Sequence, residues 1–594
     1  MLQPFTRLGL TGLCLFGLAC TGAISRGDQS SSSGPGNAGP GKGNSSPGNS
    51  GGGAQDPAVT NPPNAVNPMG LPSDDATVPG VAPLRRLTKL EYRNTVRDLL
   101  GLDSLPDAQI DAFSADQDSA ASGFLRGAAV TAAPDARGIL QAAEELGKAA
   151  LGRMGELLPC SPLPTAAAEQ DACADEFIAG FGRRAYRRPL TDAEVDELKA
   201  LYRAQRQMDI AADFTQAVAN VVSAMLQSPY FLYRWELGPN APIRDGDLIR
   251  FNEHEMASRL SYLFWASMPD DQLFEAADSG KLGTPDGVAA EARRLLASPK
   301  AGAALTDFHL QWLNMVGLED MPKDASLSDY TPEVGKSMVK ETEAFVASVY
   351  QGAQADGKFE TLLTSNRSFA DANLAKIYGL SNVSGTGMQP VELDPAQRAG
   401  LFTQGTFLAT KADAIESHPI KRGDTALAHL LCIKLEIPAD IDVPPLPEPM
   451  AGQTTRERVA QHSEAACATC HKLIDPLGFA FEHYDAIGKY RTEDAGKPVD
   501  ASGTLSLGNA TVTFKNAVEL MPQLAKSEEA RDCMATHWWR YAMRRQDLAS
   551  EKPSLELVAE AFKQSGYDLR EMLVALTRTR SFSHRKPSAG EVMP

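Results

Sequence analysis

The segment Cys467-Ala468-Thr469-Cys470-His471 is the most informative stretch of this chain of 594 residues. The two cysteines are three residues apart and the histidine follows directly, so in a helical turn all three side chains lie on one face. This C-x-x-C-H spacing is typical of c-type haem attachment, in which two thiols bond to the porphyrin and an imidazole binds iron. We therefore predict one covalent haem c, held by Cys467 and Cys470, with His471 as an axial iron ligand.

Besides a plain disulfide between Cys467 and Cys470, two other roles are open to these residues. A structural zinc site takes four ligands and usually draws them from two matching halves, whereas the chain has no second C-x-x-C. A redox dithiol of the thioredoxin type follows a strand in a βαβ unit, whereas residues 454–466 before the motif have a helical pattern. Both interpretations are weaker than haem attachment.

The sixth ligand of the iron separates two kinds of haem protein. A methionine or histidine there makes an electron-transfer centre, whereas an open position lets a small ligand bind. Met521 is the predicted distal ligand, with core packing as its alternative role. Weaker candidates are Met450, Met534, Met543, His462 and His483.

Residues that follow the C-x-x-C-H motif lead to further predictions. The step Asp475-Pro476 favours a non-helical conformation, so we expect a turn there and a bond from the second ring nitrogen of His471 to the Pro476 carbonyl. The charges of Lys489 and Arg491 suit haem propionates, and solvated loop charges are the other interpretation.

The N-terminus predicts export. An arginine precedes a short apolar run within residues 1–20, which is typical of a signal peptide and too short to cross a bilayer. The end of this run resembles a bacterial lipoprotein site, which predicts lipidation of Cys20, with an ordinary secretory signal as the alternative. Residues 21–80 are rich in Gly, Ser, Pro and Asn and predict a disordered linker. We expect a protein of the periplasm or cell surface, held at the membrane by this anchor only.

The eight cysteines fit an oxidising compartment. Cys160 and Cys173 flank a short loop that contains proline, and we predict a disulfide between them. Once the signal-peptide, lipid and haem cysteines are set aside, Cys432 and Cys533 remain as the second predicted pair. Four buried free thiols are the alternative.

Composition and pattern indicate a mainly α fold. The net charge of −18 argues against nucleic acid and anionic membrane surfaces as partners. Helix starts are expected at Thr88, Thr191, Asn252 and Thr331, and the best strand candidate is Thr511–Phe514. The predicted helical domains cover residues 81–155, 160–235, 236–350, 360–500, which ends in the haem segment, and 501–594.

Several stretches resemble one known family, the planctomycete and myxobacterial cytochrome-associated proteins. They occur in this order: Leu84–Gly101, Phe181–Thr191, Leu226–Arg234, Ser258–Trp265, Asn366–Phe369, His418–Gly423, Cys467–His471, Asp475–Glu482, Tyr484–Gly488, and Cys533 with Tyr541 and Arg544-Arg545. In that family, consecutive domains of unknown function end in a single C-x-x-C-H cytochrome segment. The resemblance implies an exported haem protein with an oxidoreductase role and no established substrate.

These observations predict an exported single-haem protein in electron transfer at the cell envelope, working with a redox partner protein or a small-molecule substrate. A haem enzyme of the peroxidase or oxygenase kind, with an open distal face, is the second hypothesis. The third is a binding or scaffold protein in which haem mainly stabilises the fold.

Overall fold

The computed structural model describes residues 70–591, except 83, 114, 119–122, 128–132, 208–211, 235, 237–242, 436–445, 447, 449, 461–466 and 590. The fold is mainly helical, with 57% helix and 9% strand, as the sequence predicts. The predicted signal peptide, Cys20 and His462 lie outside the described residues, as does most of a Pro-rich stretch before the haem segment. In the described part of the chain, no helix combines the length and apolarity needed to span a bilayer.

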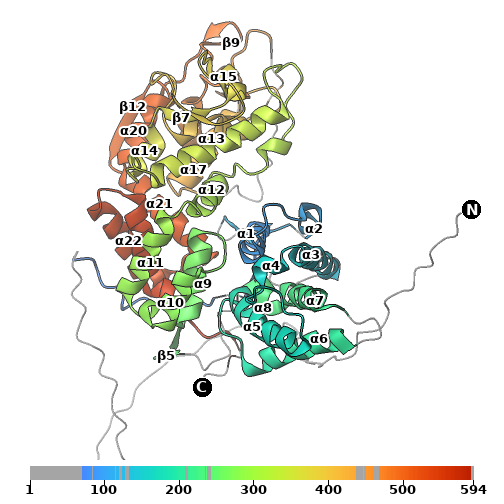
Figure 1. Cartoon of the computed structure of the whole chain (residues 1–594). Helices are drawn as coiled ribbons and strands as arrows, with labels where there is room; N and C mark the ends of the chain where they lie inside the picture. The colour runs from blue at the N-terminus through green and yellow to red at the C-terminus, as the bar shows by residue number, and fades with distance from the viewer. Residues whose placement is uncertain are drawn as a thin grey trace, which may run out of the picture. The chain divides into compact units, whose positions relative to one another are not determined.

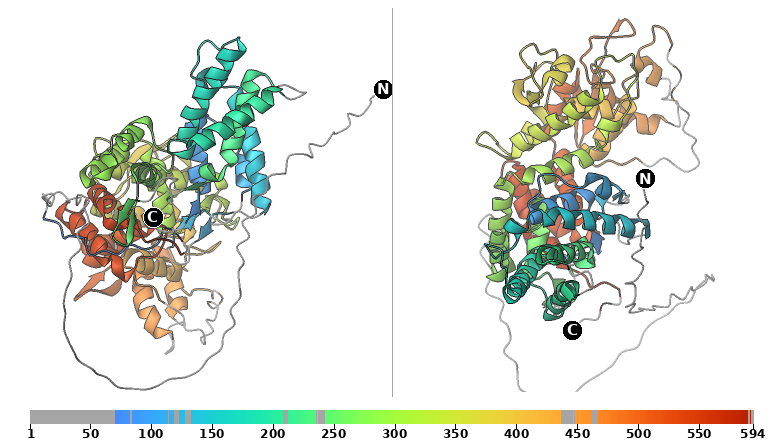
Figure 2. Two further views of the ribbon diagram at one scale, coloured as in Figure 1. Left: turned by 90° about the horizontal axis from the view of Figure 1, so that it is seen from below. Right: turned by 45° about the vertical axis from the view of Figure 1, so that its right-hand side comes forward.

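The first helical group runs to residue 234, and its apolar core also includes Tyr262 and Met268 from the segment that follows. Capping boxes open two helices as predicted, with Thr88 and Glu91 bonded reciprocally at the first and Thr191 and Glu194 at the second. Figures 1 and 2 show α5, α6 and α7 side by side. The group comprises α1 (Lys89–Leu100), α2 (Asp107–Asp111), α3 (Ala133–Leu151), α4 (Met154–Leu157), α5 (Ala167–Tyr186), α6 (Asp192–Gln207), α7 (Phe214–Gln227) and α8 (Pro229–Leu232).

The first helical group also contains two short antiparallel strand pairs. They are β1 (Arg85–Arg86) with β4 (Tyr233–Arg234) and β2 (Gln117–Asp118) with β3 (Leu125–Arg126). The predicted disulfide Cys160–Cys173 is present and joins the loop before α5 to that helix.

The next elements include two helix starts that the sequence predicts. Asn252 forms a capping box with Glu255, and Thr331 caps a helix that has Pro332 in its first turn. The elements are β5 (Ile243–Asp245), β6 (Leu248–Arg250), α9 (Glu253–Phe264), α10 (Asp271–Asp278), α11 (Pro285–Ala297), α12 (Ala301–Trp312), α13 (Pro332–Tyr350), α14 (Phe359–Thr364), β7 (Arg367–Ala370), α15 (Ala372–Tyr378) and β8 (Gln389–Glu392), with 3-10 turns at Lys281–Gly283 and Leu318–Asp320.

The C-terminal part begins with the 3-10 turn Leu401–Thr403 and α16 (Gly405–Thr410). The predicted strand Thr511–Phe514 forms most of β12 and pairs with β11. The remaining elements are α17 (Pro419–Leu430), α18 (Thr455–Ala460), α19 (Ala468–Phe479), β9 (Glu493–Asp494), β10 (Lys497–Pro498), β11 (Gly503–Leu507), β12 (Ala510–Phe514), α20 (Ala517–Lys526), α21 (Glu528–Met543), a 3-10 turn at Ala549–Glu551, α22 (Lys552–Gln564), α23 (Leu569–Arg578), α24 (Arg580–Ser583) and β13 (His584–Arg585).

One large apolar core unites the three predicted domains after residue 236. Its buried members include Phe124 from the first helical group and then run from Phe251, the residue after β6, to Phe582 on α24. The antiparallel pair β6–β13 and the packing of α11 against α23 bring distant parts of the sequence together. Buried residues of all three predicted domains thus belong to one apolar cluster, and the domain boundaries stay a prediction.

Residues near the predicted end of the linker belong to this folded body. Asp74 accepts bonds from the Ser554 hydroxyl (2.8 Å) and the Arg580 backbone N–H (2.6 Å), and the Ser550 hydroxyl donates to the Val78 carbonyl (2.7 Å). The composition that predicted a linker up to residue 80 missed these contacts, because they are polar and made with residues far along the chain.

Candidate functional site

The cysteine motif lies on the first turn of α19. Cys467 is the residue before the helix, and Cys470 and His471 follow within the first turn. All three side chains are partly exposed, and neither Cys467 nor Cys470 is in a disulfide. A single helical turn therefore presents two thiols and one imidazole at the surface, where a bound cofactor can contact them.

His471 is oriented by a carboxylate on its own helix. Its Nδ1 lies 2.8 Å from Oδ1 of Asp475, one turn along α19. The predicted acceptor, the Pro476 carbonyl, lies within the helix and receives the Ala480 backbone N–H (3.4 Å). The predicted turn at Asp475-Pro476 is wrong, because α19 continues through Pro476 to Phe479. A proline removes one helical hydrogen bond, and the packing of α17 and β11 on this helix outweighs that loss.

The C-terminal half of α19 crosses α17 at two glycines. A Cβ added at Gly478 would lie 2.1 Å from the Pro419 carbonyl oxygen, and one added at Gly423 would lie 2.3 Å from the Ile474 carbonyl oxygen. Only glycine permits backbones to approach this closely. We call Gly423 and Gly478 the glycine crossing, and it fixes α19 against the body of the protein.

Arg422, which precedes the crossing on α17, ties down the loop that follows α19. It is fully buried, and burial lowers its pKa to about 10. Glu482 lies 3.9 Å from the same guanidinium, and burial raises the pKa of that carboxyl. The guanidinium donates to the carbonyls of Leu408 (3.1 Å), Phe481 (3.0 Å), Tyr484 (2.8 Å) and Asp485 (2.8 Å).

Met521, the predicted distal ligand, lies on α20 and is fully buried in the large apolar core. The start of α20 meets the end of α19, where the Ala517 N–H donates to the Ala480 carbonyl (2.8 Å). His471 is nine residues before Ala480, roughly 13 Å along a helix. The position of Met521 therefore favours core packing, and its role as a ligand stays a prediction.

The weaker distal candidates are spread over several elements. Met534 and Met543 are buried on α21, and Met450 is 57% exposed. The Nδ1 atom of His483 lies 2.9 Å from the Arg491 carbonyl oxygen, and its ring stacks on Tyr490.

The two expected propionate partners already bind carboxylates of the chain. Arg491 donates to Glu482 (2.9 Å) and Asp494 (2.9 Å), and Lys489 donates to Asp329 (2.7 Å). Arg491 therefore supports the loop after α19 together with Arg422. A role for Lys489 and Arg491 toward haem propionates stays a prediction.

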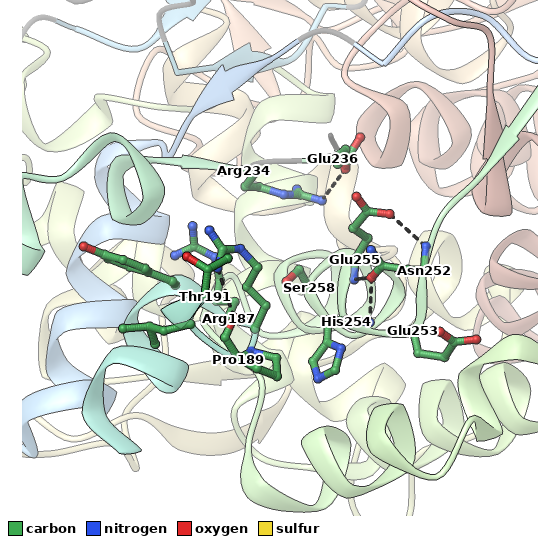
Figure 3. Close-up of a pocket in the computed structure, with 13 residues that line it drawn as sticks. Arg187, Pro189, Thr191, Arg234, Glu236, Asn252, Glu253, His254, Glu255 and Ser258 are labelled. Carbon is green, nitrogen blue, oxygen red and sulfur yellow. Dashed lines mark hydrogen bonds and ion pairs between the residues drawn. The ribbon is translucent and has the colours of Figure 1, made fainter. Parts of the chain in front are cut away.

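A pocket of about 280 Å³ lies between the end of α5 and the start of α9 (Figure 3). Arg187, Arg188, Glu236 and His254 line it. Arg187 donates to four chain carbonyls, and Arg188 forms a two-point bond with Glu194 (2.9 and 2.7 Å). These arginines serve the fold, and we assign no ligand to this pocket.

The arginine and glycines that support α19 were not assigned by sequence reasoning. Arg422 and Gly423 belong to the quoted stretch His418–Gly423, and Gly478 belongs to Asp475–Glu482. In the sequence these residues stood out only as members of two short motifs, one before and one after the cysteine pair. Their contact across two helices is not visible from local spacing.

Five protein families match consecutive segments of the chain, and each is described as a protein of unknown function. They are DUF1587 at residues 85–152, DUF1595 at 173–236, DUF1592 at 251–380, DUF1588 at 398–494 and DUF1585 at 511–582. The DUF1588 segment, with the family name PSCyt3, contains the C-x-x-C-H motif. No curated protein and no solved structure matches the chain.

Proposed function

We propose that this chain, which carries five consecutive domains of the planctomycete-type cytochrome-associated family, is an exported single-haem cytochrome that transfers electrons at the cell envelope. The observation that carries the proposal is the first turn of α19. There, two unpaired cysteines and a histidine share one helical face.

The donor set fits a covalent haem better than zinc. A structural zinc ion takes four ligands, whereas Cys467, Cys470 and His471 supply two thiols and one imidazole at the spacing of haem c attachment. Both thiols are partly exposed and outside any disulfide. When bound, haem c would supply a reversible one-electron centre.

Each residue of the motif has a separate part in this proposal. Cys467 and Cys470 would hold the porphyrin through thioether bonds, and Nε2 of His471 would bind iron. The Asp475 carboxylate lies beside Nδ1 of His471 at 2.8 Å, so it would keep the proton on Nδ1 and make the imidazole a stronger donor. The glycine crossing would keep this helix rigid during electron transfer.

The location of the protein is part of the same proposal. Haem c is attached outside the cytoplasm, and the apolar run in residues 1–20 would direct export. Lipidation at Cys20 would then hold the folded body at a membrane through residues 21–69, which are rich in Gly, Ser and Pro. The partner would be a redox protein or a small-molecule substrate.

The first experiment is a covalent haem stain of the full chain, exported in a host that matures haem c. We expect a stained band that persists after denaturation. The variant Cys467→Ala with Cys470→Ala should lose it, whereas the matched variant Cys160→Ala with Cys173→Ala should keep it. An unstained wild-type band would overturn the proposal.

The visible spectrum of the same sample tests electron transfer against the haem-enzyme hypothesis. A low-spin reduced spectrum that carbon monoxide does not change supports electron transfer, because the sixth position is then filled. A high-spin spectrum that shifts with carbon monoxide would favour the enzyme. If the low-spin spectrum survives Met521→Leu, another residue is the distal ligand.

A further inference from the structure

A second cluster of sulfur and imidazole lies away from the C-x-x-C-H turn. The predicted disulfide Cys432–Cys533 is present and joins the residue after the last turn of α17 to α21. His537 lies one turn beyond Cys533 on α21, and its Nε2 is 3.7 Å from Sγ of Cys432. The two sulfur atoms and one imidazole nitrogen all lie within 4.8 Å of one another.

The distance from the Cys432 sulfur to the His537 nitrogen matches an edge of a tetrahedral metal site. Zinc binds sulfur at about 2.3 Å and imidazole nitrogen at about 2.0 Å, so ligand atoms around it are roughly 3.5–3.8 Å apart. The observed sulfur to nitrogen separation of 3.7 Å falls in this range. The two cysteine sulfurs reach such a separation only when the bond between them is broken.

The surroundings hold the imidazole in place, and the residue Cys432 lies at the surface of the protein. The ring of His429 stacks on His537 with centroids 5.6 Å apart, and the His429 carbonyl receives the Trp312 indole N–H (2.7 Å). Cys432 is exposed, whereas Cys533 and His537 are buried. A reductant can therefore reach the disulfide from solvent while its histidine stays fixed.

The ring that stacks on His537 also has a nitrogen that is unpartnered among the described residues, although it is not one of the three atoms of the cluster. Nδ1 of His429 is buried and has no hydrogen-bond partner within the described part of the chain. Buried polar atoms of this kind are uncommon and need an explanation, such as an unseen ion or water. The Cys160–Cys173 pair has no such neighbours, since the metal-ligating group found among the described residues contains only the other disulfide.

We propose that Cys432, Cys533 and His537 form a redox-controlled site for a thiophilic cation such as Zn²⁺. A dithiol reductant supplies two electrons that break the S–S bond, and it becomes a disulfide itself. Two protons go to the sulfur atoms of Cys432 and Cys533. The cation then displaces both protons and binds the two thiolates and Nε2 of His537, which leaves a fourth position for water.

The oxidised state, with its disulfide, and the reduced state, with its bound cation, would both join α17 to α21. The disulfide and the metal site each connect the end of α17 to α21, and α17 is the helix that crosses α19. The connection therefore persists when the disulfide is reduced in the presence of the cation. This inference does not depend on haem binding.

The test uses Co²⁺ as a spectroscopic probe on the reduced full chain. Cys467→Ser and Cys470→Ser are introduced first, so that the other cysteine pair cannot bind the probe. We expect a sulfur-to-cobalt charge-transfer band that Cys432→Ser abolishes. His537→Ala should weaken cobalt binding at least about tenfold, because even residues behind the ligands contribute 10–100-fold. The matched Cys160→Ser with Cys173→Ser should keep the band.

A second measurement avoids variants that fail to fold. In the unaltered full chain, after reduction, Zn²⁺ should slow alkylation of Cys432 and Cys533, as read by mass spectrometry of their peptides. Cys160 and Cys173 should be alkylated at the same rate with and without Zn²⁺. Equal alkylation of Cys432 and Cys533 in both conditions, or a cobalt spectrum unchanged by His537→Ala, would overturn the proposal.

Discussion

The two halves of α19 differ in what holds them. Its first turn carries Cys467, Cys470 and His471, all partly exposed, whereas Leu477 and Gly478 in the second half are buried. The second half packs on α17 through backbone contact and on the loop that Arg422 binds. The C-terminal half of α19 is thus packed against the rest of the protein, whereas the partly exposed side chains of its first turn can contact a bound cofactor. The difference predicts that substitutions in the two halves have separable effects.

The largest expected effect is a loss of stability when the loop that follows α19 loses its hydrogen bonds to Arg422. Arg422→Ala removes the guanidinium that donates to four backbone carbonyls and leaves buried Glu482 with Arg491 as its remaining cation, so it should lower the free energy of unfolding by about 3–5 kcal/mol. The control is Lys421→Ala, next to it on α17, whose exposed ion pair with Asp413 contributes about 0–1 kcal/mol. Urea denaturation measures both. Similar losses in the two variants would mean that Arg422 does not hold this half in place.

A buried acid on α13 should give the body a pH dependence. Glu341 accepts bonds from Ser368 (2.6 Å) and Tyr378 (2.5 Å), and the Tyr378 hydroxyl accepts from the backbone N–H of Gly405. Burial raises the pKa of Glu341 from 4.5 to about 7 in the folded protein. The folded state therefore retains a proton that the unfolded chain loses between pH 4.5 and 7.

The contribution of Glu341 to stability should consequently be largest below pH 4.5 and fall by up to about 3 kcal/mol as the pH rises to 7. Glu341→Gln removes this contribution, whereas Glu343→Gln, an exposed position on the same helix, should retain it. Urea midpoints at pH 4.5, 6 and 7 measure the difference. If the wild type and Glu341→Gln have parallel pH profiles, the carboxyl does not titrate as proposed.

The glycine crossing should tolerate no added methyl group. Gly478→Ala places a carbon 2.1 Å from the Pro419 carbonyl oxygen, and the helices must move apart. We expect a loss of about 1–3 kcal/mol in the free energy of unfolding. Gly302→Ala is the matched control, because its added carbon meets nothing within 4 Å and helical alanine is favoured over glycine. A neutral Gly478→Ala would contradict the close crossing.

Local chemistry was predictable from the sequence, because its causes lie within a few residues. Thr88 and Asn252 each meet a glutamate three residues on, and the structure has both capping boxes. Residues with a strand pattern at Thr511–Phe514 form β12. The Cys160–Cys173 disulfide followed from the short loop between the two cysteines. The Cys432–Cys533 disulfide, between residues far apart in the sequence, followed only from setting the other cysteines aside.

Contacts between distant segments were not predictable in the same way. Pro476 usually ends a helix, yet α19 passes through it because α17 and β11 pack against that segment. Arg422 could be noted only as part of a motif, since its four acceptor carbonyls lie 14 to 63 residues away. His537 beside Cys432 also depends on the packing of α21 against α17.

The smallest effect on folding is expected in the exposed half of α19, where chemistry should change instead. Asp475→Asn should lower the free energy of unfolding by less than about 1 kcal/mol, because its ion pair is partly exposed.

In the haem-loaded chain the same change weakens the acceptor for Nδ1 of His471, which makes the imidazole a poorer donor to iron. Fe(III) then loses more stabilisation than Fe(II), so the midpoint potential should rise by tens of millivolts, a tenfold difference in affinity being about 59 mV. Potentiometric titration measures this shift, with Thr469→Ala on the same turn as the control. An unchanged potential together with a large loss of stability would mean that Asp475 serves packing, and the two halves of α19 would then not differ as described.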